Sequence, residues 1–323
     1  MIVEILIFIV AIFVLSWLSS RLVSTLIDVA KYLGWREFII AFFVMAFAGA
    51  LPNLFVDINA ALHNLPQIAL GDILGGNLVD LTLVMAIAVL LGFGPLPAES
   101  EMVQKSAIFT ALIAILPVFL IWDGRLGRID GVILLGTFAL YTWWLFSKEE
   151  RFKKAYRGRP KNTSRGYFGF LINMVKIVIF LALLLVTSYF IINLAQFFSG
   201  QLGVSLSLVG ILIVGLGNCF PELYFSIVSA KRGENWMILG DLMGSVIICA
   251  TLVLGTIGVI APFEIADMSP FIITRMFTVL ASLLFIIFIR TRKEITKVEG
   301  LVLLFIYILF LLVEIFLPYF YSV

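Results

Sequence analysis

Charged residues are scarce in this chain of 323 residues: Asp, Glu, Lys and Arg together make up 13% of it, whereas hydrophobic residues make up 62%. Soluble globular domains carry about 25% charged residues, so the composition excludes a soluble domain of this size. The net charge of +2 is close to zero and says nothing about partners. The composition predicts an integral membrane protein.

Cysteine is almost absent as well. The two cysteines, Cys219 and Cys249, both fall inside long apolar runs, which argues against a secreted disulfide framework. A buried cysteine usually serves as a small apolar side chain. The opening residues, MIVEILIFIV, also lack a basic start and a small-residue cleavage site, so we expect a retained helix and not a secretion signal.

Long apolar runs recur along the whole chain. Each is close to the roughly 20 residues that a helix needs to cross a hydrocarbon core of about 30 Å. The sequence therefore predicts an all-α integral membrane protein with ten transmembrane helices. The predicted spans are 2–30, 37–62, 67–92, 106–122, 130–147, 167–198, 205–230, 236–261, 270–290 and 298–319.

The basic residues indicate an orientation. The densely basic segment 148–166 follows the fifth span, and loops rich in Lys and Arg stay in the cytoplasm. We expect a multi-pass protein of the cell membrane with a cytoplasmic linker and both termini outside. We interpret the linker as a topology signal and not as a nucleic-acid or lipid site, and no obligate protein partner is evident. The same orientation puts inside Lys31, Arg36, Lys105, Lys231, Arg232, Arg290, Arg292, Lys293 and Lys297, and outside Arg125, Arg128 and Arg275.

An internal repeat divides the chain. The segment LPNLFVDINAALHNLPQIALGDILGGNLVDLTLV, from Leu51, aligns without a gap with FPELYFSIVSAKRGENWMILGDLMGSVIICATLV, from Phe220, and prolines, glycines and Leu-Gly-Asp coincide. Each half holds five spans, and because five is odd the second copy enters the membrane in the opposite direction, as in many transporters. We expect two inverted five-helix repeats, 1–147 and 167–323, joined by the linker 148–166.

The repeated prolines and glycines predict irregular helices at membrane depth. Pro52 and Pro221 each remove a backbone donor, and we expect both to break their helices. Freed carbonyls are tolerated there only where protein or a wet cavity satisfies them, and they can bind hard cations such as Na⁺ or Ca²⁺. Close approach or unwinding is expected at Gly49, Gly75, Gly215, Gly217 and Gly244.

Carboxylates inside the membrane are functional candidates because burying them is costly. Glu222, Asp80 and Asp57 lie nearest to the middle of their spans. Residues four apart share a helix face. This pairs Asn53 with Asp57, Gly76 with Asp80, and Ser245 with Cys249. Asp72 and Asp241 are equivalent in the two copies. Two interpretations stay open for them: each caps a helix N-terminus, or each belongs to the ion pathway.

These motifs resemble the α-repeats of the calcium/cation antiporter superfamily, the sodium/calcium exchangers. The second copy reads GNCFPEL at 217–223 and GDLMGSV at 240–246, and the first reads AGALPNL at 48–54 and GDILGGN at 71–77. The resemblance implies a secondary active cation antiporter that works by alternating access. It also implies that spans one and six slide across a core of spans two, three, seven and eight.

The resemblance also implies a cation site. The family binds Ca²⁺ with the glutamate of each P-E motif, and these positions hold Asn53 and Glu222. Flanking Na⁺ sites use hydroxyls and side chains at positions that here hold Ala50, Cys219, Gly76, Ser245, Asp80 and Cys249. The family's carbonyl ligands fall at Ala46, Gly49, Gly215 and Asn218.

The departures from the family pattern shape the expected chemistry. Glu222 and Asp80 are the expected metal ligands, with Asp57 close to their reach, and Ala50 and Gly76 stand where the family has hydroxyls. We expect exchange like that of a sodium/calcium exchanger, with no cofactor besides the transported cations. The alternatives are proton-coupled exchange, another divalent ion or a softer metal on the thiols, and an ion sensor without transport. An intramembrane aspartyl protease is rejected because the chain lacks G-x-G-D and its Tyr-Asp partner.

Overall fold

The computed structural model describes residues 2–32, 37–92, 94–147, 167–233, 235–265 and 267–321. Side chains of residues 37–49 are not part of this description. The predicted linker 148–166 and Arg36 lie outside the described residues.

Helices make up nearly all of the described chain. The first half contains α1 (Ile2–Tyr32), α2 (Glu37–Leu62), α3 (Pro66–Val79), η1 (Asp80–Val84), α4 (Met85–Leu91), β1 (Leu96–Pro97), α5 (Glu101–Leu120), β2 (Arg125–Leu126) and α6 (Arg128–Phe146). The second half contains α7 (Tyr167–Leu202), α8 (Leu206–Val209), η3 (Gly210–Val214), α9 (Gly215–Asn218), α10 (Phe220–Arg232), α11 (Asn235–Ile248), η4 (Cys249–Val253), α12 (Leu254–Ile260), β3 (Phe263–Glu264), η5 (Ser269–Phe271), α13 (Ile272–Thr291) and α14 (Lys297–Tyr321).

The ten predicted spans correspond to ten helical segments among the described residues. α3, η1 and α4 form one continuous segment, so do α11 to α12, and α8 to α10 form one segment that a turn at Cys219 interrupts. By length and composition alone, eight of the segments are long and apolar enough to cross a bilayer. In α2 the stretch Ala50–Leu62 is apolar but shorter than such a span. The fourth span begins earlier than predicted, at Glu101, because its polar first turn follows Ser100 and stands before the apolar run.

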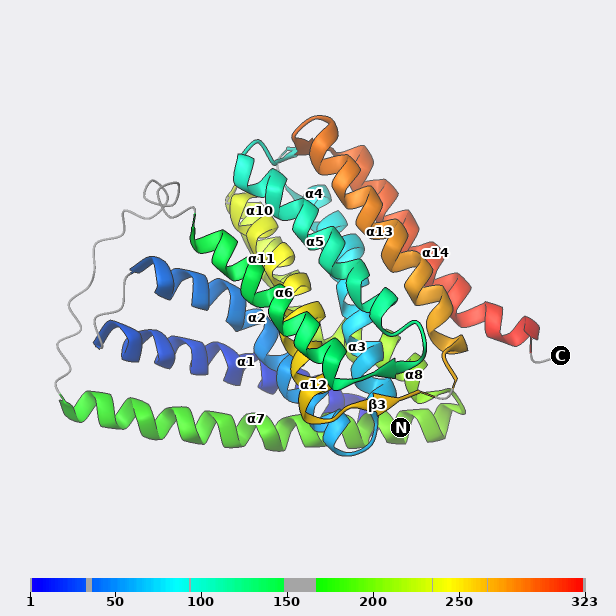
Figure 1. The fold of residues 1–323 in the computed structure, drawn as a ribbon, viewed down its shortest axis with the longest axis horizontal. Coiled ribbons are helices and arrows are strands. Elements are labelled where there is room, and N and C mark those ends of the chain that lie inside the picture. The colour runs from blue at the N-terminus through cyan, green and yellow to red at the C-terminus, as the bar shows by residue number, and fades with distance from the viewer. Residues whose placement is uncertain are drawn as a thin grey trace.

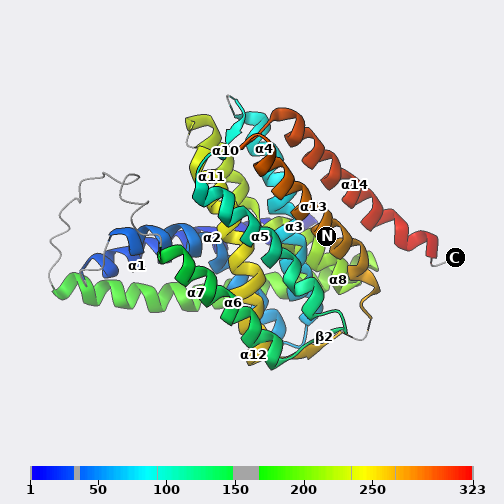
Figure 2. The same cartoon turned by 45° about the horizontal axis from the view of Figure 1, so that its top comes forward.

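The two longest helices, α1 and α7, run with α2 at an angle to the helices of the central bundle (Figure 1). Figure 1 shows α1 and α7 side by side across the lower part of the molecule, while α5, α13 and α14 rise steeply, and Figure 2 agrees. At about 1.5 Å per residue the 36 residues of α7 extend roughly 54 Å, well beyond a hydrocarbon core of about 30 Å. Both helices must therefore be strongly tilted in a bilayer.

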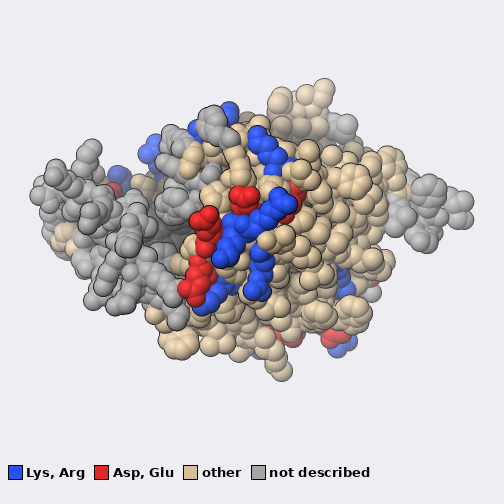
Figure 3. Space-filling model, turned by 90° about the horizontal axis from the view of Figure 1, so that it is seen from above, with Lys and Arg blue, Asp and Glu red and all other residues tan. Residues whose placement is uncertain are grey.

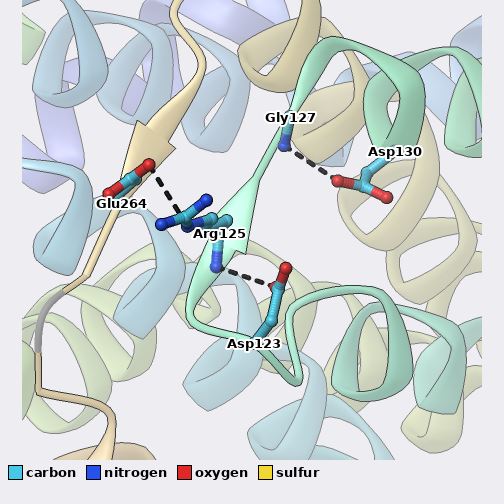
Figure 4. A network of polar contacts seen from close by, with 5 residues as sticks. All are labelled: Asp123, Arg125, Gly127, Asp130 and Glu264. Atoms are coloured by element: carbon cyan, nitrogen blue, oxygen red, sulfur yellow. Dashed lines mark hydrogen bonds and ion pairs between the residues drawn. The ribbon is translucent and has the colours of Figure 1, made fainter.

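Two short antiparallel ladders tie the halves together. β1 of the first half pairs with β4 (Glu294–Ile295) of the second, and β2 of the first half pairs with β3 of the second. At the β2–β3 ladder, Arg125 Nε lies 3.2 Å from Glu264 Oε1, as Figure 4 shows. Exchanging the halves turns one ladder into the other, which is the relation expected of two repeats around a two-fold axis.

The first turns of α6 and α14 repeat this symmetry. The Gly127 N–H donates to Asp130 Oδ2 at 2.8 Å (Figure 4), and the Thr296 N–H donates to Glu299 Oε2 at 2.7 Å. Both pairs span three residues and cap a helix N-terminus with an acid, where the helix dipole favours negative charge. The duplication therefore extends beyond the aligned segment into the last helix of each half.

A π-helical turn interrupts the third helix of each half at the same position. η1 begins at Asp80 and η4 begins at Cys249, which are equivalent residues. In each, a threonine hydroxyl donates to the carbonyl four residues earlier, Thr82 to Leu78 and Thr251 to Ile247. Such π turns are frequent at functional sites because they redirect the side chains around them.

Glycines let the central helices touch through their backbones. A Cβ atom on Gly75 would lie 2.4 Å from the Ile211 carbonyl oxygen, and one on Gly215 would lie 2.9 Å from the Gly76 nitrogen. On Gly217 it would meet side chains of α1 and no backbone, first the flexible end of Ile12 and then Phe8. The expected close approach at Gly244 is wrong, because no atom lies within 4 Å of the position that a Cβ would take there.

Charge gathers on one face of the molecule. Figure 3, a view from above Figure 1, shows Lys and Arg side chains together with Asp and Glu over the start of α5 and the turn between α13 and α14. Exposed residues of these segments include Lys105, Arg290, Arg292, Lys293 and Lys297. All of them belong to the set that the sequence assigns to the cytoplasmic side.

Candidate cation site

A helix break in the second half organises the candidate site. α9 ends at Asn218 and α10 begins at Phe220, with Cys219 between them at φ −84° and ψ 0° and Pro221 in the first turn of α10. Proline suits a first turn because no intrahelical bond uses its missing N–H. Pro52 behaves differently, since α2 is continuous through it. The expectation that both prolines break their helices is wrong for Pro52, where one lost donor does not end the helix.

Glu222 and Asp80 come together although they belong to different halves. Both side chains are buried, each with 2% of its surface exposed. The Ser245 hydroxyl donates to Glu222 Oε1 at 3.3 Å and also lies within hydrogen-bonding reach of Asp80, and the two acids interact electrostatically. One oxygen of each carboxylate, Glu222 Oε2 and Asp80 Oδ1, has no hydrogen-bond partner.

Asn53, which stands at the family's first glutamate position, is bonded to Cys249 of the second half. Asn53 Nδ2 donates to the Cys249 sulfur at 3.0 Å, and Asn53 Oδ1 is buried without a partner. The other thiol, Cys219, donates to the Gly76 carbonyl at 3.4 Å. Both sulfurs thus take part in neutral hydrogen bonds across the interface of the two halves.

Asp72 lies in a second polar cluster. Asn218 Nδ2 donates to Asp72 Oδ2 at 2.6 Å, and the carboxyl groups of Asp57 and Asp72 interact electrostatically. Neither oxygen of Asp57 receives a donor, although the side chain is fully buried.

The cap interpretation of Asp72 and Asp241 is wrong. α3 begins at Pro66 and α11 begins at Asn235, so both acids lie beyond the first turn of their helices. For α3 the reason is Pro66, because proline suits the first turn of a helix and so favours a start at this residue. Asp241 is half-buried and interacts electrostatically with Glu222 and Asp80.

The predicted carbonyl ligands are only partly described. A Cβ on Gly76 would lie 3.5 Å from the Cys219 sulfur, 3.8 Å from the Gly215 carbonyl oxygen and 3.9 Å from Asp72 Oδ1, so the thiol and both oxygens border Gly76. Ala46 and Gly49 fall in the part of α2 whose surroundings are not described, and their role stays a prediction. Ala50 is buried, and His63, in the turn after α2, is exposed.

Two polar residues were missed by the sequence reasoning. Asn77 is buried with neither side-chain polar atom bonded, and so is the hydroxyl of Ser226. Both carried a signal: Asn77 ends the motif GDILGGN, and Ser226 follows Glu222 by one helical turn.

Acidic and soft ligands alone do not make a metal site here. Within the described residues, no three His, Cys, Asp or Glu side chains are grouped so that they could hold a metal ion. The set Cys219, Cys249 and Glu222, considered for a softer metal, therefore does not form such a group. A cation between Glu222 and Asp80 would need hydroxyl, amide and carbonyl oxygens as further ligands.

Ten helical segments in two related halves, with buried carboxylates where distorted helices meet, define a membrane transporter of cations. A family model described as sodium/calcium exchanger protein matches residues 3–147 and 172–316. The chain belongs to this family and is a cation antiporter, not an enzyme.

Known relatives match nearly the whole chain. The sodium/calcium exchanger MaX1 of Methanosarcina acetivorans is 25% identical and covers 91% of this chain and 93% of its own length. The putative antiporter CaxA of Alkalimonas amylolytica is 27% identical over 93% of this chain and 94% of its own. The inner membrane protein YrbG of Escherichia coli is 25% identical over 80% of each.

Solved structures confirm the fold. The sodium-calcium exchanger NCX_Mj, soaked with Na⁺ and Sr²⁺, superposes with a TM-score of 0.62 at 23% identity and covers 96% of this chain and 98% of its own. The same protein soaked with Na⁺ and Ca²⁺ also gives a TM-score of 0.62. The predicted all-α fold of ten membrane helices is therefore confirmed.

Proposed function

We propose that this chain exchanges a divalent cation, most simply Ca²⁺, for Na⁺, and that Glu222 and Asp80 bind the divalent ion. The observation that supports this most is the Ser245 hydroxyl, which lies within reach of both carboxylates where the two halves meet. Two carboxylates neutralise one divalent charge. The unpartnered oxygens of Glu222, Asp80 and Asn53 are free to turn toward an ion.

The same charges give a reason for obligatory exchange. Two buried carboxylates without a cation repel each other and have lost their hydration, which makes the empty carrier costly to move through its closed states. A bound ion removes this cost. Only the loaded carrier crosses readily, so outward movement of one ion is coupled to inward movement of the other.

Alternating access requires a moving part, and α1 with α7 is the best candidate. These helices pack on each other and on α2, and much of the α7 surface is exposed and apolar, as a lipid-facing helix would be. α3 is in backbone contact with α8, η3 and α9, which suits a rigid core. We infer that α1 and α7 slide over this core and open the site to each side in turn.

We also infer that the charged face of Figure 3 is cytoplasmic and that both termini are outside the cell membrane. Arg292 follows the end of α13 on the charged face, whereas Asp123 follows the end of α5, whose start lies on that face, and both residues are exposed. A cysteine introduced as Arg292→Cys should react with a membrane-impermeant maleimide only after the cells are opened, whereas Asp123→Cys should react in intact cells. The reverse pattern would invert the orientation.

Ion flux in proteoliposomes tests the function. An outward Na⁺ gradient should drive Ca²⁺ uptake, and Glu222→Gln or Asp80→Asn should abolish it, because either change leaves the divalent ion half compensated. Glu314→Gln is the matched control. Glu314 is also a buried acid, but its carboxylate accepts a hydrogen bond from Thr274, at 3.3 Å, and not from Ser245. Unchanged flux in Glu222→Gln would reject the site. Uptake driven by a pH gradient but not by Na⁺ would make the proton the counter-ion, and absence of any flux would favour an ion sensor.

A further inference from the structure

A buried hydrogen bond joins α2 to α7, the longer of the two helices for which sliding is proposed. Asn59 Nδ2 donates to Ser188 Oγ at 2.8 Å and also to the Leu185 carbonyl oxygen at 3.3 Å. Asn59 is 7% exposed and Ser188 is fully buried, so water competes little for either group. An amide that donates to a hydroxyl and to a backbone carbonyl of one partner helix fixes its position along that helix.

Asn59 lies on the stationary side of the proposed movement. α2 packs on α3, α11 and η4 of the central bundle as well as on α1 and α7. The bond therefore crosses the surface along which α7 would slide. By contrast, the hydroxyl of Thr187 and the amide of Asn193, also on α7, donate to carbonyl oxygens of α7 itself.

A second contact with α7 lies one helical turn further along the chain. His63, in the turn after α2, has its ring centroid 5.4 Å from that of Tyr189, the residue that follows Ser188. The His63 Nδ1–H donates to the Asn59 carbonyl oxygen at 2.8 Å, since a carbonyl oxygen only accepts. Asn59 and His63 thus contact consecutive residues of α7.

The neighbouring positions on α7 cannot replace Ser188. Four residues away in either direction, the same face of α7 carries Leu184 and Ile192, and both are buried. A slide of one helical turn, about 5.4 Å, would place one of these apolar side chains opposite Asn59. The amide would lose its hydroxyl acceptor, and burial would keep water from replacing it. The bond therefore favours one register of α7 over the registers a turn away.

We propose that Asn59 is a positioning residue that holds α7 in the register seen here and releases it each time the site turns to the other side of the membrane. The inference rests on the proposed sliding of α1 and α7, and it adds a contact that sets the balance between the two end states. Exchange requires the bond to break and to form again. Removing either partner shifts the balance away from this register.

Pulsed electron double resonance on the purified full chain in lipid nanodiscs tests the proposal. Spin labels are attached at Val178→Cys on α7 and Ile129→Cys on α6, two exposed positions on the moving helix and on the bundle. Distances are recorded over a range of Na⁺ and Ca²⁺ concentrations, and the odds of the two registers are taken where the parent protein populates both. Asn59→Ala and Ser188→Ala should each lower the odds of this register at least about threefold. The double variant should match the larger single change within about twofold, because both substitutions remove the same bond.

Thr187→Ala is the matched control. It removes a hydroxyl from the adjacent residue of α7, whose bond stays within the helix, and should change the odds by less than about twofold. Unchanged odds in both Asn59→Ala and Ser188→Ala, or an equal change in Thr187→Ala, overturn the proposal and leave the sliding mechanism standing. So does a lower melting temperature without a change in the odds, because the bond would then only stabilise the fold. A single distance in the parent protein at every ion concentration overturns the sliding mechanism and the proposal together.

Discussion

Single residues explain how this chain differs from the family pattern that its sequence resembles. Asn53 stands at the position of a family glutamate, Cys249 stands one turn after Ser245, and the two side chains hydrogen-bond each other. Asp80 supplies a carboxylate from the first half instead. The negative charge thus keeps one contribution from each half, although the residue that carries it in the first half has changed.

The Asn53–Cys249 bond gives a prediction for stability. Cys249→Ala leaves the buried Asn53 amide without its acceptor and should cost about 1–3 kcal/mol, whereas Cys249→Ser keeps an acceptor and should cost less than about 1 kcal/mol. Thermal unfolding of the two variants in detergent measures the difference. Equal melting temperatures would mean that the bond contributes nothing.

Part of the site was readable from the sequence. The family resemblance predicts that Glu222, Asp80 and Ser245 belong to one cation site. In the structure the Ser245 hydroxyl donates to Glu222, and Asp80 and Glu222 interact electrostatically, while their joint binding of a cation stays a prediction. The Asn53–Cys249 bond and the Asp57–Asp72 interaction could not be predicted, because they depend on how the helices are rotated against each other. Asp72 was ambiguous since a glycine-rich stretch follows it, and only the start of α3 at Pro66 decides against a cap.

At the scale of elements, backbone contact between helices holds the centre rigid. Gly75 packs against the Ile211 carbonyl, while its repeat equivalent Gly244 faces open space. The same sequence signal therefore has a packing role in one half only. The periodicity of apolar residues predicts the helices well, but it carries no sign of the π turns at Asp80 and Cys249, which differ from the surrounding helix by one residue per turn.

These two glycines form a matched pair for mutation. Gly75→Ala forces a methyl group into the backbone of η3 and should destabilise the protein by about 1–3 kcal/mol, whereas Gly244→Ala fits and should be neutral or slightly stabilising. Fluorescence-detected gel filtration after heating compares them. If Gly244→Ala is the more damaging change, the helix contact described here is wrong.

At the scale of the whole molecule, the fold was predictable because ten apolar spans and an ungapped repeat leave few alternatives. For α1 and α7, the sequence predicts only that the helices are tilted, because they are longer than a bilayer core is thick. Their packing partners required the structure. Ile12 of α1 meets Gly217 of α9, and Phe8 of α1 meets Phe198 of α7 with ring centroids 5.5 Å apart.

Cross-linking separates sliding of α1 and α7 from a static role. A pair introduced as Ile12→Cys and Gly217→Cys joins α1 to the core and should stop flux when a short bifunctional thiol reagent is added. The control pair Phe8→Cys and Phe198→Cys joins α1 to α7 and should leave flux intact, since both helices move together. Full activity of the first cross-linked pair would contradict the sliding mechanism. The native cysteines are buried, which protects them from the reagent.

The central claim is that carboxylates from the two halves hold one divalent cation between them. Anomalous diffraction from crystals of this protein soaked in SrCl₂ tests it most directly, because Sr²⁺ is a heavier analogue of Ca²⁺. The account predicts a peak bounded by Glu222, Asp80 and Ser245, at about the 2.3–2.6 Å from carboxylate oxygens that Ca²⁺ adopts, or slightly more. A peak elsewhere in the membrane region, with these residues left without an ion, would contradict it.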